Sequence, residues 1–253
     1  MISRTLIVPA AGLGTRLNAD RPKLLVPVAG VPMIDRLLGL FAGVVDRAAV
    51  VVHPSFESSV ADHLRTSPLP VSTFVQSTPT GMLDAIMIPD VMHGPAAPDE
   101  VWIAWCDQVA IHPVTIERLA ELTGRHRDAA VVMPTVRRST PYIHLQRDGT
   151  NRITGILHRR EGDPMPDVGE SDMGLFALPS PSFANLLPRY SEAVTRGSST
   201  GERNFLPFIA WANAGYDVVT FPAHDEMEAV GVNTPDELQA VEQYLSARGA
   251  RDN

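Results

Sequence analysis

The stretch PAAGLGTRLNADRPKLLVPVAG, residues 9–30, contains two closely spaced glycines, Gly12 and Gly14, and the single lysine of the chain, Lys23. The apolar run TLIVPA at residues 5–10 leads into it and predicts a buried strand. Glycines placed directly after a strand let backbone amides approach an anion without obstruction by side chains. The stretch therefore predicts a strand followed by an anion-binding loop, although a tight turn between strand and helix would use the same glycines.

Two basic side chains favour the anion-binding interpretation. Arg16 carries a forked guanidinium and Lys23 a compact ammonium, and these groups complement different oxygens of a polyphosphate. The chain has 21 lysine and arginine residues, and all of them except Lys23 are arginines. We infer that lysine is kept at position 23 because arginine would fail there. The alternative is that it survives by chance on a solvated loop. Leu17 stands where a dinucleotide fingerprint needs its third glycine, and no Walker A sequence is present. We expect nucleotide phosphates to contact Ala10, Ala11, Gly12, Gly14 and Thr15.

The composition limits the class of protein. The 253 residues are 44% hydrophobic, which is enough apolar material for a substantial core. A formal net charge of -8 excludes a general nucleic-acid or anionic-membrane surface, since both require an excess of basic residues. The single cysteine, Cys106, excludes an internal disulfide. No segment reaches the roughly 20 apolar residues of a membrane span, and no apolar signal core opens the chain, so we expect a cytoplasmic protein without a membrane partner.

Short apolar runs alternate with helical patterns, which is typical of a mostly parallel sheet covered by helices. Strands are expected at residues 5–10, 48–53, 71–76, 101–105, 129–136, 142–146, 173–178, 217–222 and 228–233, helices at 33–41, 56–65, 112–124, 182–190, 203–213 and from 235, and a polar loop at 158–172. We predict an α/β fold in a single domain over residues 1–253. Residues 1–125 would form a nucleotide-binding half, and residues 126–253 an acceptor-binding half with an irregular substrate-binding lid.

The segment GLGTRLNADRPKLLVPVAGVPMID, residues 12–35, resembles the G-x-G-T-R…P-K…G-x-P-M signature of the sugar-1-phosphate nucleotidyltransferase family. Within that family the chain is most similar to the uridylyltransferase domain of UDP-N-acetylglucosamine pyrophosphorylases, without their acetyltransferase domain. The similarity continues through Gln76 with Gly81, through residues 106–119 and through residues 231–238, so it covers most of the chain. It implies a Rossmann-like, mostly parallel sheet of the glycosyltransferase-A-like type.

The resemblance implies a catalytic centre formed by Arg16, Lys23 and Asp107, with Mg²⁺ held by Asp107 and Asn233. Asp107 follows the expected strand at 101–105, and open α/β sheets bind ligands at such carboxyl ends. Mg²⁺ takes few protein ligands and completes its octahedron with water and phosphate oxygens, so one carboxylate and one amide are sufficient. A turn before a helix would also explain Asp107, and a helix cap would also explain Asn233.

The resemblance also implies a base-recognition pair, Gln76 and Gly81. The Gln76 amide offers a donor and an acceptor, while Gly81 leaves space for the base. We therefore favour a pyrimidine nucleotide, although Gln76 would also suit an ordinary polar position at a strand end. Met82, which is also expected to contact the nucleotide, departs from the threonine usual in the relatives.

The acceptor-binding residues carried over from the relatives are Tyr142, Gly155, His158 and Asp172. His158 replaces a glutamate and Asp172 an asparagine, and Ile143 stands where the relatives have glycine. These replacements change which hydroxyl or amino groups can be paired, and unpaired buried polar groups are costly. N-acetylglucosamine 1-phosphate is therefore not assigned as the substrate.

We expect an Mg²⁺-dependent nucleotidyltransferase that couples a nucleoside triphosphate to a sugar 1-phosphate, releasing pyrophosphate and giving a nucleotide-sugar. A cytidylyltransferase for a small non-sugar phosphate or phosphonate is the alternative that His158 and Asp172 keep open. A catalytically silent nucleotide-sensing subunit is a second alternative, against which Arg16, Lys23 and Asp107 count. The expected partners are a nucleoside triphosphate and a small phosphorylated acceptor, and homo-oligomerisation stays open.

Overall fold

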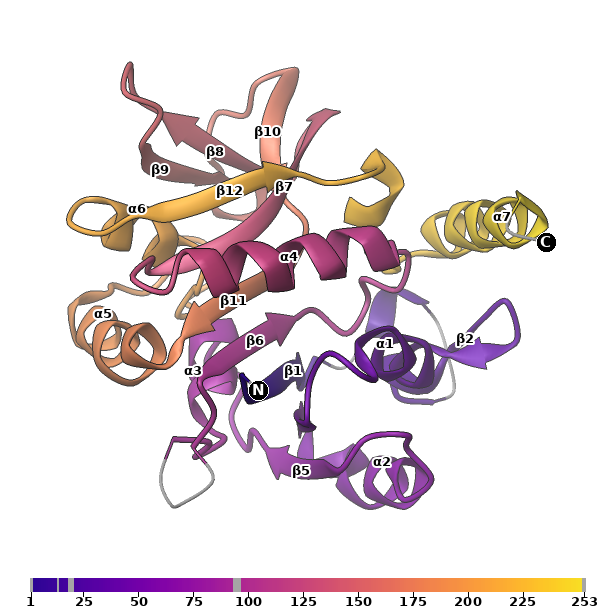
Figure 1. Ribbon diagram of the computed structural model, residues 1–253. Helices are drawn as coiled ribbons and strands as arrows, with labels where there is room; N and C mark the ends of the chain where they lie inside the picture. Colours follow the sequence, from indigo (N-terminus) through magenta and orange to yellow (C-terminus); the bar gives the residue numbers. More distant parts are fainter. Residues whose placement is uncertain (1, 13, 18–20, 93–96, 252–253) are drawn as a thin grey trace.

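The computed structural model describes residues 2–12, 14–17, 21–92 and 97–251 (Figure 1). Within these residues, eight strands form one sheet in the order β10-β7-β11-β6-β1-β4-β5, and β12 pairs with β7. The strands are β1 Arg4–Ala10, β4 Arg47–Val52, β5 Val71–Val75, β6 Glu100–Ala104, β7 Val131–Ser139, β10 Val168–Asp172, β11 Leu175–Pro179 and β12 Val218–Pro222.

The first half of the chain forms the parallel part of this sheet. β1 pairs in parallel with β4 and β6, and β4 pairs in parallel with β5. In the second half, β11 runs antiparallel to β6 and β7, β10 runs antiparallel to β7, and β12 runs parallel to β7. The predicted α/β fold with a mostly parallel central sheet is confirmed. Because parallel strands are covered on both faces, they appear in the sequence as continuous apolar runs.

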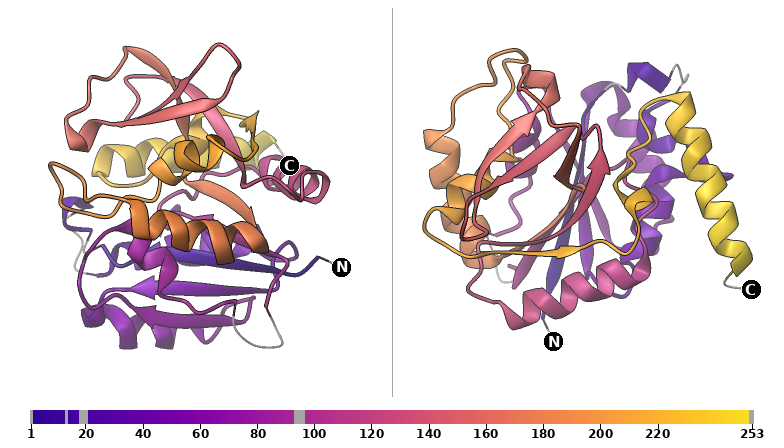
Figure 2. Two further views of the ribbon diagram at one scale, coloured as in Figure 1. Left: turned by 90° about the vertical axis from the view of Figure 1, so that its left-hand side faces the viewer. Right: turned by 90° about the horizontal axis from the view of Figure 1, so that it is seen from above.

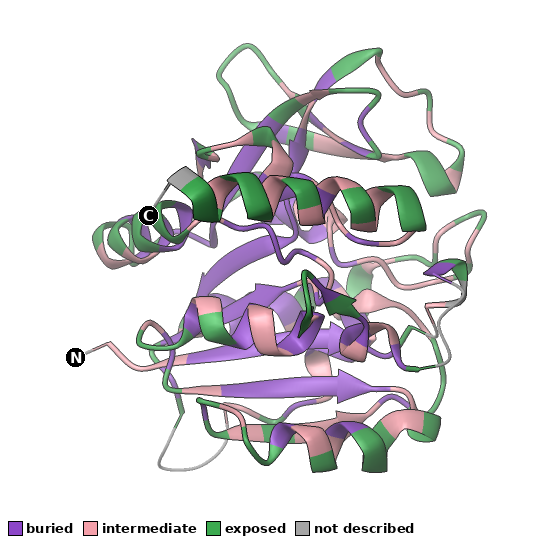
Figure 3. Cartoon of the chain, turned by 90° about the vertical axis from the view of Figure 1, so that its right-hand side faces the viewer, coloured by how far each residue is buried: buried purple, intermediate pink, exposed green. Residues whose placement is uncertain are grey.

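Helices cover both faces of the sheet, as alternation along β1 shows. Leu6 and Val8 pack into one core cluster, and Ile7 points into another. The first cluster is covered by α1 Met33–Phe41, α2 Glu57–Leu64 and α4 Pro113–Arg125, and the second by α3 Met82–Met87, α5 Leu187–Ala193 and α6 Pro207–Asn213. Figure 3 shows the strands buried and the outer faces of the helices exposed.

The last helix, α7 Pro235–Arg251, lies at one side of the molecule, with the C-terminus at its end (Figures 1 and 2). Its Val241 joins a small third cluster with Val232, Val28 and Met33. The remaining elements are the two-stranded pairs β2 Pro27–Val28 with β3 Val31–Pro32 and β8 Ile143–Arg147 with β9 Ile153–His158, the 3-10 turns η1 Thr15–Leu17, η2 Lys23–Leu25, η3 Pro54–Phe56, η4 Arg159–Glu161 and η6 Glu226–Ala229, and a π-helical turn, η5 Ser182–Leu186.

Two sequence predictions are wrong in the second half. Residues 228–233 are not a strand, because Asp225 and Glu228 form a reciprocal capping box that starts the η6 turn. The polar loop expected at 158–172 ends in β10, which pairs with the long strand β7. Glu170 of β10 accepts two bonds of 2.7 Å from Arg147, so an ion pair rather than an apolar pattern holds this edge. Helix α3 and strand β9 were not predicted.

The connection between β10 and β11 depends on Gly174. Its φ is +68°, and a Cβ at this position would lie 2.3 Å from Trp105 Cδ1. The Gly174 N–H donates to Asp172 Oδ2 at 2.8 Å, and its carbonyl accepts from the Trp105 N–H at 2.9 Å. Glycine is required here both by the left-handed backbone and by the close approach of the indole.

We expect Gly174→Ala to lower the free energy of unfolding by about 2–4 kcal/mol, because it combines backbone strain with overpacking. Urea denaturation checks this. Gly39→Ala is the matched control, since Gly39 is exposed in α1 and an added methyl group meets nothing within 4 Å. That control should be neutral or stabilising by up to about 1 kcal/mol. Equal effects of the two substitutions would show that the β10–β11 connection is not constrained as described.

Candidate active site

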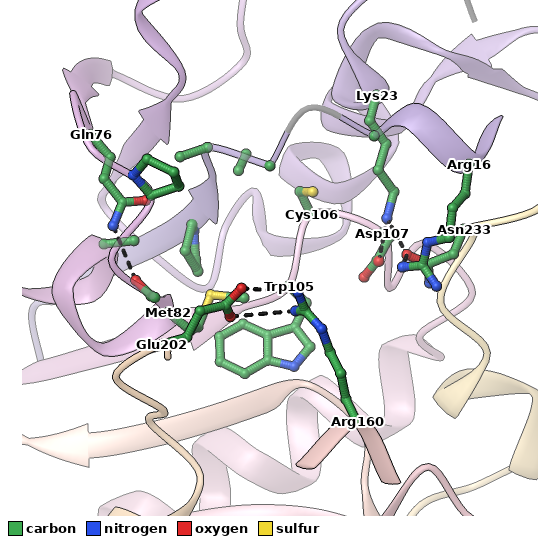
Figure 4. Close-up of a pocket in the computed structure, with 18 of the residues that line it drawn as sticks. Arg16, Lys23, Gln76, Met82, Trp105, Cys106, Asp107, Arg160, Glu202 and Asn233 are labelled. Atoms are coloured by element: carbon green, nitrogen blue, oxygen red, sulfur yellow. Dashed lines mark hydrogen bonds and ion pairs between the residues drawn. The ribbon is translucent and has the colours of Figure 1, made fainter. Parts of the chain in front are cut away.

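A cavity of about 670 Å³ opens at the carboxyl ends of β1 and β6 (Figure 4). This is the edge at which open α/β sheets bind ligands. Twelve residues predicted from sequence line it, from segments far apart in the chain: Ala10, Ala11, Gly12, Gly14, Arg16, Lys23, Gln76, Gly81, Met82, Asp107, Tyr142 and Asn233.

Three predicted acceptor-binding residues do not line the cavity. Gly155 of β9 lies beneath the side chain of Gln146, and Asp172 is buried where β10 ends. His158 contacts Tyr142 edge to face, with ring centroids 5.2 Å apart. The side chain of Thr15 lies outside the described part of the structure, although its backbone belongs to η1.

The Lys23 ammonium is the centre of the cationic end of the cavity. Its Nζ donates to Asp107 Oδ2 at 2.5 Å and to Asn233 Oδ1 at 2.8 Å. Arg16 Nη2 donates to the same Asn233 oxygen at 3.1 Å. The Lys23 and Asp107 side chains are 13% and 16% exposed, so the pair is largely shielded but open to the cavity. The two proposed metal ligands therefore meet at one positive charge (Figure 4).

In the loop after β1, Gly14 leaves room for the side chain of Lys23. Gly14 has φ +65°, and a Cβ there would lie 2.6 Å from Lys23 Cβ. The Gly14 carbonyl accepts from the Leu17 N–H and starts the η1 turn, and the Lys23 carbonyl accepts from the Val26 N–H and closes η2. The lysine stem therefore packs directly on Gly14, which gives this glycine a structural reason beyond anion binding.

The segment before α7 holds Asn233 in place. Glu237 Oε2 accepts from the Asn233 N–H at 2.8 Å, and the Thr234 hydroxyl accepts from the Glu237 N–H at 3.3 Å. Thr234, not Asn233, therefore supplies the side-chain oxygen that caps the helix. The Val232 N–H donates to the Asp107 carbonyl at 3.1 Å, which ties this segment to the end of β6. The Asn233 side-chain oxygen is left directed at the cations.

The donor set at this end fits Mg²⁺. Asp107 Oδ2 and Asn233 Oδ1 are hard oxygen ligands that already converge on a single cation, the Lys23 ammonium. A Cβ on Gly231 would lie 3.1 Å from Asp107 Cγ and 3.2 Å from Asn233 Nδ2, so glycine leaves room for the two side chains. No group of three or more His, Cys, Asp or Glu side chains within the described residues could hold a metal. A metal bound here would therefore need water and phosphate oxygens to complete its shell.

The other end of the cavity carries Gln76, which is only 6% exposed. Its Nε2 donates to the Gly81 carbonyl at 3.0 Å, and its backbone N–H donates to the Val52 carbonyl. The bond to Gly81 orients the amide and leaves its carbonyl oxygen as the group that can accept from a base N–H. The backbone of Arg203 bonds Thr80 and Leu83, on either side of Gly81, and so fixes the segment that faces Gln76.

Several lining residues were not predicted as site residues, among them Trp105, Arg160 and Glu202. Trp105 lies two positions before Asp107, so its place at the strand end was available as a signal. Arg160 and Glu202 lie in irregular segments with no motif. Cys106 also lines the cavity, and burial raises the pKa of its thiol to about 12, so the thiol is neutral and not a nucleophile.

Glu161 ties together the two irregular segments beside the cavity. Its carboxylate accepts from Thr200 Oγ1 at 2.5 Å, from the Ser199 N–H at 2.9 Å and from Asn204 Nδ2 at 3.2 Å. These donors, with that of Thr200 first, lower the pKa of the Glu161 carboxyl to about 2. The carboxylate therefore stays ionised at neutral pH and holds η4 against residues 199–204.

Known proteins resemble this chain over most of its length. Residues 6–165 match the MobA-like NTP transferase domain. The bifunctional protein GlmU of Alkalilimnicola ehrlichii is 31% identical over 98% of this chain and 52% of its own length. Those of Paramagnetospirillum magneticum and Pseudomonas syringae pv. syringae are 32% and 28% identical over 98% and 99% of this chain, and over 54% and 53% of their own lengths. The chain thus spans about half the length of these relatives. Among the described residues, none of the helices has the length and apolar character needed to cross a bilayer.

Asp172 is a buried carboxyl group at the end of β10. Burial raises the pKa of its carboxyl to about 6, and the Gly174 N–H partly opposes that shift. Between about pH 4 and 6 the unfolded state loses this proton and the folded state keeps it, so Asp172 makes stability fall as pH rises. Asp172→Asn removes this effect. The free energy of unfolding of the variant relative to wild type should therefore rise by on the order of 2–3 kcal/mol as the pH is raised from 4 to 7.

Urea denaturation of both proteins across that pH range gives the measurement. Asp148→Asn is the control with the opposite sign, because hydrogen bonds from Thr150 and Arg152 lower the pKa of the Asp148 carboxyl. Its wild-type contribution is present above the unfolded pKa and lost on acidification. A stability difference for Asp172→Asn that does not change with pH would contradict the proposed protonation of Asp172.

Proposed function

Because the chain belongs to the MobA-like NTP transferase family, we propose that this nucleotidyltransferase couples a nucleoside triphosphate to a sugar 1-phosphate, with Mg²⁺ and with release of pyrophosphate. The observation that carries the proposal is that, on the wall of a cavity of about 670 Å³, Lys23 bonds both Asp107 and Asn233 and Arg16 bonds the same Asn233. A polyphosphate needs such a cationic end, and the rest of the cavity has room for a base and an acceptor.

The proposed reaction is an in-line substitution at the α-phosphorus of the triphosphate. An oxygen of the acceptor phosphate forms the new P–O bond, and the bond to the β-phosphate breaks with its electron pair leaving on pyrophosphate. The second pKa of a phosphate monoester is about 6, so the attacking group is mostly a dianion at neutral pH and needs no general base. Positioning and neutralisation of charge then supply most of the rate enhancement.

The residues at the cationic end divide this work. Lys23 would leave Asp107 and bind the phosphates near the reacting centre, since its flexible stem lets the ammonium move without a change in the backbone. Arg16, which is exposed at the mouth, would bind the leaving pyrophosphate. Asp107 and Asn233 would hold Mg²⁺, which when bound neutralises charge on phosphate oxygens. The backbone amides after β1 would bind the triphosphate.

At the opposite end, the Gln76 amide would read the base from its buried position beside Gly81. The carbonyl oxygen of Gln76 would accept from a base N–H, as a pyrimidine such as uracil offers. We further propose that residues 1–125 supply most of the nucleotide contacts and residues 126–253 most of the acceptor contacts. Asn233 is the exception, because it reaches the cationic end from the second half.

One observation favours a second candidate for the acceptor. Of the four residues expected to bind the acceptor, Tyr142 lines the cavity, whereas Gly155, His158 and Asp172 do not. Beside Tyr142, the wall offers Trp105, Arg160 and Glu202. A small non-sugar phosphate or phosphonate, activated with a cytidine nucleotide, would fit this wall without the hydroxyl-binding set of a sugar site.

A substrate matrix tests the proposed function and separates its two candidates. The four common ribonucleoside triphosphates are combined with glucose 1-phosphate, N-acetylglucosamine 1-phosphate, glycerol 3-phosphate, phosphoethanolamine and 2-aminoethylphosphonate, and pyrophosphate release is measured with Mg²⁺ and with EDTA. We expect Mg²⁺-dependent release for at least one pair. If the chain binds a triphosphate but releases pyrophosphate with none of the acceptors, the proposal is contradicted and a nucleotide-sensing role is supported.

Lys23→Ala should reduce pyrophosphate release at least about 100-fold, the effect of removing one group that stabilises charge in the transition state. Its melting temperature should change little, because within the described residues the Lys23 ammonium bonds only Asp107 and Asn233, which both line the open cavity. Lys23→Arg should also be impaired, since a guanidinium differs in reach and geometry. Arg21→Ala is the matched control, because Arg21 is exposed and does not line the cavity. Full activity in Lys23→Ala would remove the central assignment.

A further inference from the structure

Arg160 and Glu202 form an ion pair on the wall of the cavity beside Trp105 (Figure 4). Arg160 Nη2 lies 3.0 Å from Glu202 Oε1, while Nη1 lies 3.4 Å from Oε2, beyond a good hydrogen-bond length. The two side chains are 54% and 30% exposed. An exposed pair with one long contact is weak, so the guanidinium can exchange Glu202 for another anion.

The turn that carries Arg160 is fixed on both sides of it. Arg159 donates from its guanidinium to the Pro141 carbonyl at 3.1 Å, and Glu161 binds donors of residues 199–204. The His158 N–H donates to Asp163 Oδ2 at 2.8 Å and closes the turn. The polar groups on either side of Arg160 are thus used to hold the backbone. Arg160 is the residue of η4 whose side chain lines the cavity.

A cation on the Arg160 wall would balance the charge of the acceptor phosphate when it meets the triphosphate in the cavity. Among the described lining residues, the basic ones are Arg16, Lys23 and Arg160. Arg16 and Lys23 both bond Asn233 Oδ1 and so share one end. The attacking phosphate is a dianion that must approach an anionic triphosphate, and its own charge also has to be balanced. A planar guanidinium with paired donors suits a phosphate monoester.

Resting on the proposed function, we propose that Arg160 binds the phosphate of the acceptor, and that Glu202 is the partner it releases when the acceptor enters. Glu202 holds the guanidinium towards the cavity before the acceptor binds, and competes with the acceptor for it. The two residues therefore have opposite effects on acceptor binding. If the ion pair served only to join the two segments, loss of Arg160 and loss of Glu202 would change acceptor binding in the same direction.

Steady-state kinetics on Arg160→Gln and Glu202→Gln test this, using whichever acceptor of the substrate matrix supports the fastest pyrophosphate release. Arg160→Gln should raise the acceptor KM about 10- to 100-fold, as expected for loss of a hydrogen bond between charged groups. The KM for the triphosphate should stay within about twofold, because its phosphates lie at the Lys23 end. Glu202→Gln should lower the acceptor KM, because the competing carboxylate is gone.

Arg65→Gln is the matched control, since Arg65 forms an exposed ion pair with Asp62 on the surface at α2 and does not line the cavity. Melting temperatures of all variants show that they are folded. An unchanged acceptor KM in Arg160→Gln, a matching rise in the triphosphate KM, or a rise in acceptor KM in Glu202→Gln would overturn the assignment while the proposed function stands. A wild-type chain that releases no pyrophosphate with any pair would overturn both.

Discussion

One ammonium group organises the cationic end of this molecule. Lys23 bonds Asp107 and Asn233, which lie 84 and 210 positions away in the chain. The contact requires the loop after β1, the end of β6 and the segment before α7 to meet at one edge of the sheet. Parallel strands bring their carboxyl ends together there, and the left-handed Gly14 lets the lysine stem cross the loop. The fold thus places a positive charge beside the carboxylate of Asp107 and the amide oxygen of Asn233.

The sequence predicted the first half of the fold better than the second, for a physical reason. The parallel strands β1, β4 and β6 are buried on both faces and are therefore visible as apolar runs, and α1 has apolar residues at helical spacing. In the second half, β10 is held by pairing with β7 and by the Arg147–Glu170 ion pair, neither of which leaves an apolar pattern. A capping box decided the conformation at residues 225–228, where apolar residues nearby suggested a strand.

The candidate site shows a similar division. The family signature pointed to Lys23, Asp107 and Asn233, and the structure brings their side chains together. Arg160 and Glu202 could not be found in this way, since they lie outside the family signature and their segments are held beside the cavity by long-range bonds such as those of Glu161. Of the four acceptor-binding residues carried over by resemblance, Tyr142 lines the cavity, and the wall is otherwise built partly from side chains such as Trp105.

The most direct measurement is a crystal structure of the chain with a non-hydrolysable nucleoside triphosphate and Mn²⁺ in place of Mg²⁺. If the convergence at Lys23 is the phosphate and metal site, anomalous density for Mn²⁺ will lie between Asp107 and Asn233. The Lys23 ammonium will then have left Asp107 for a phosphate oxygen. A structure in which Lys23 keeps its bond to Asp107 while the nucleotide and metal bind elsewhere would contradict this.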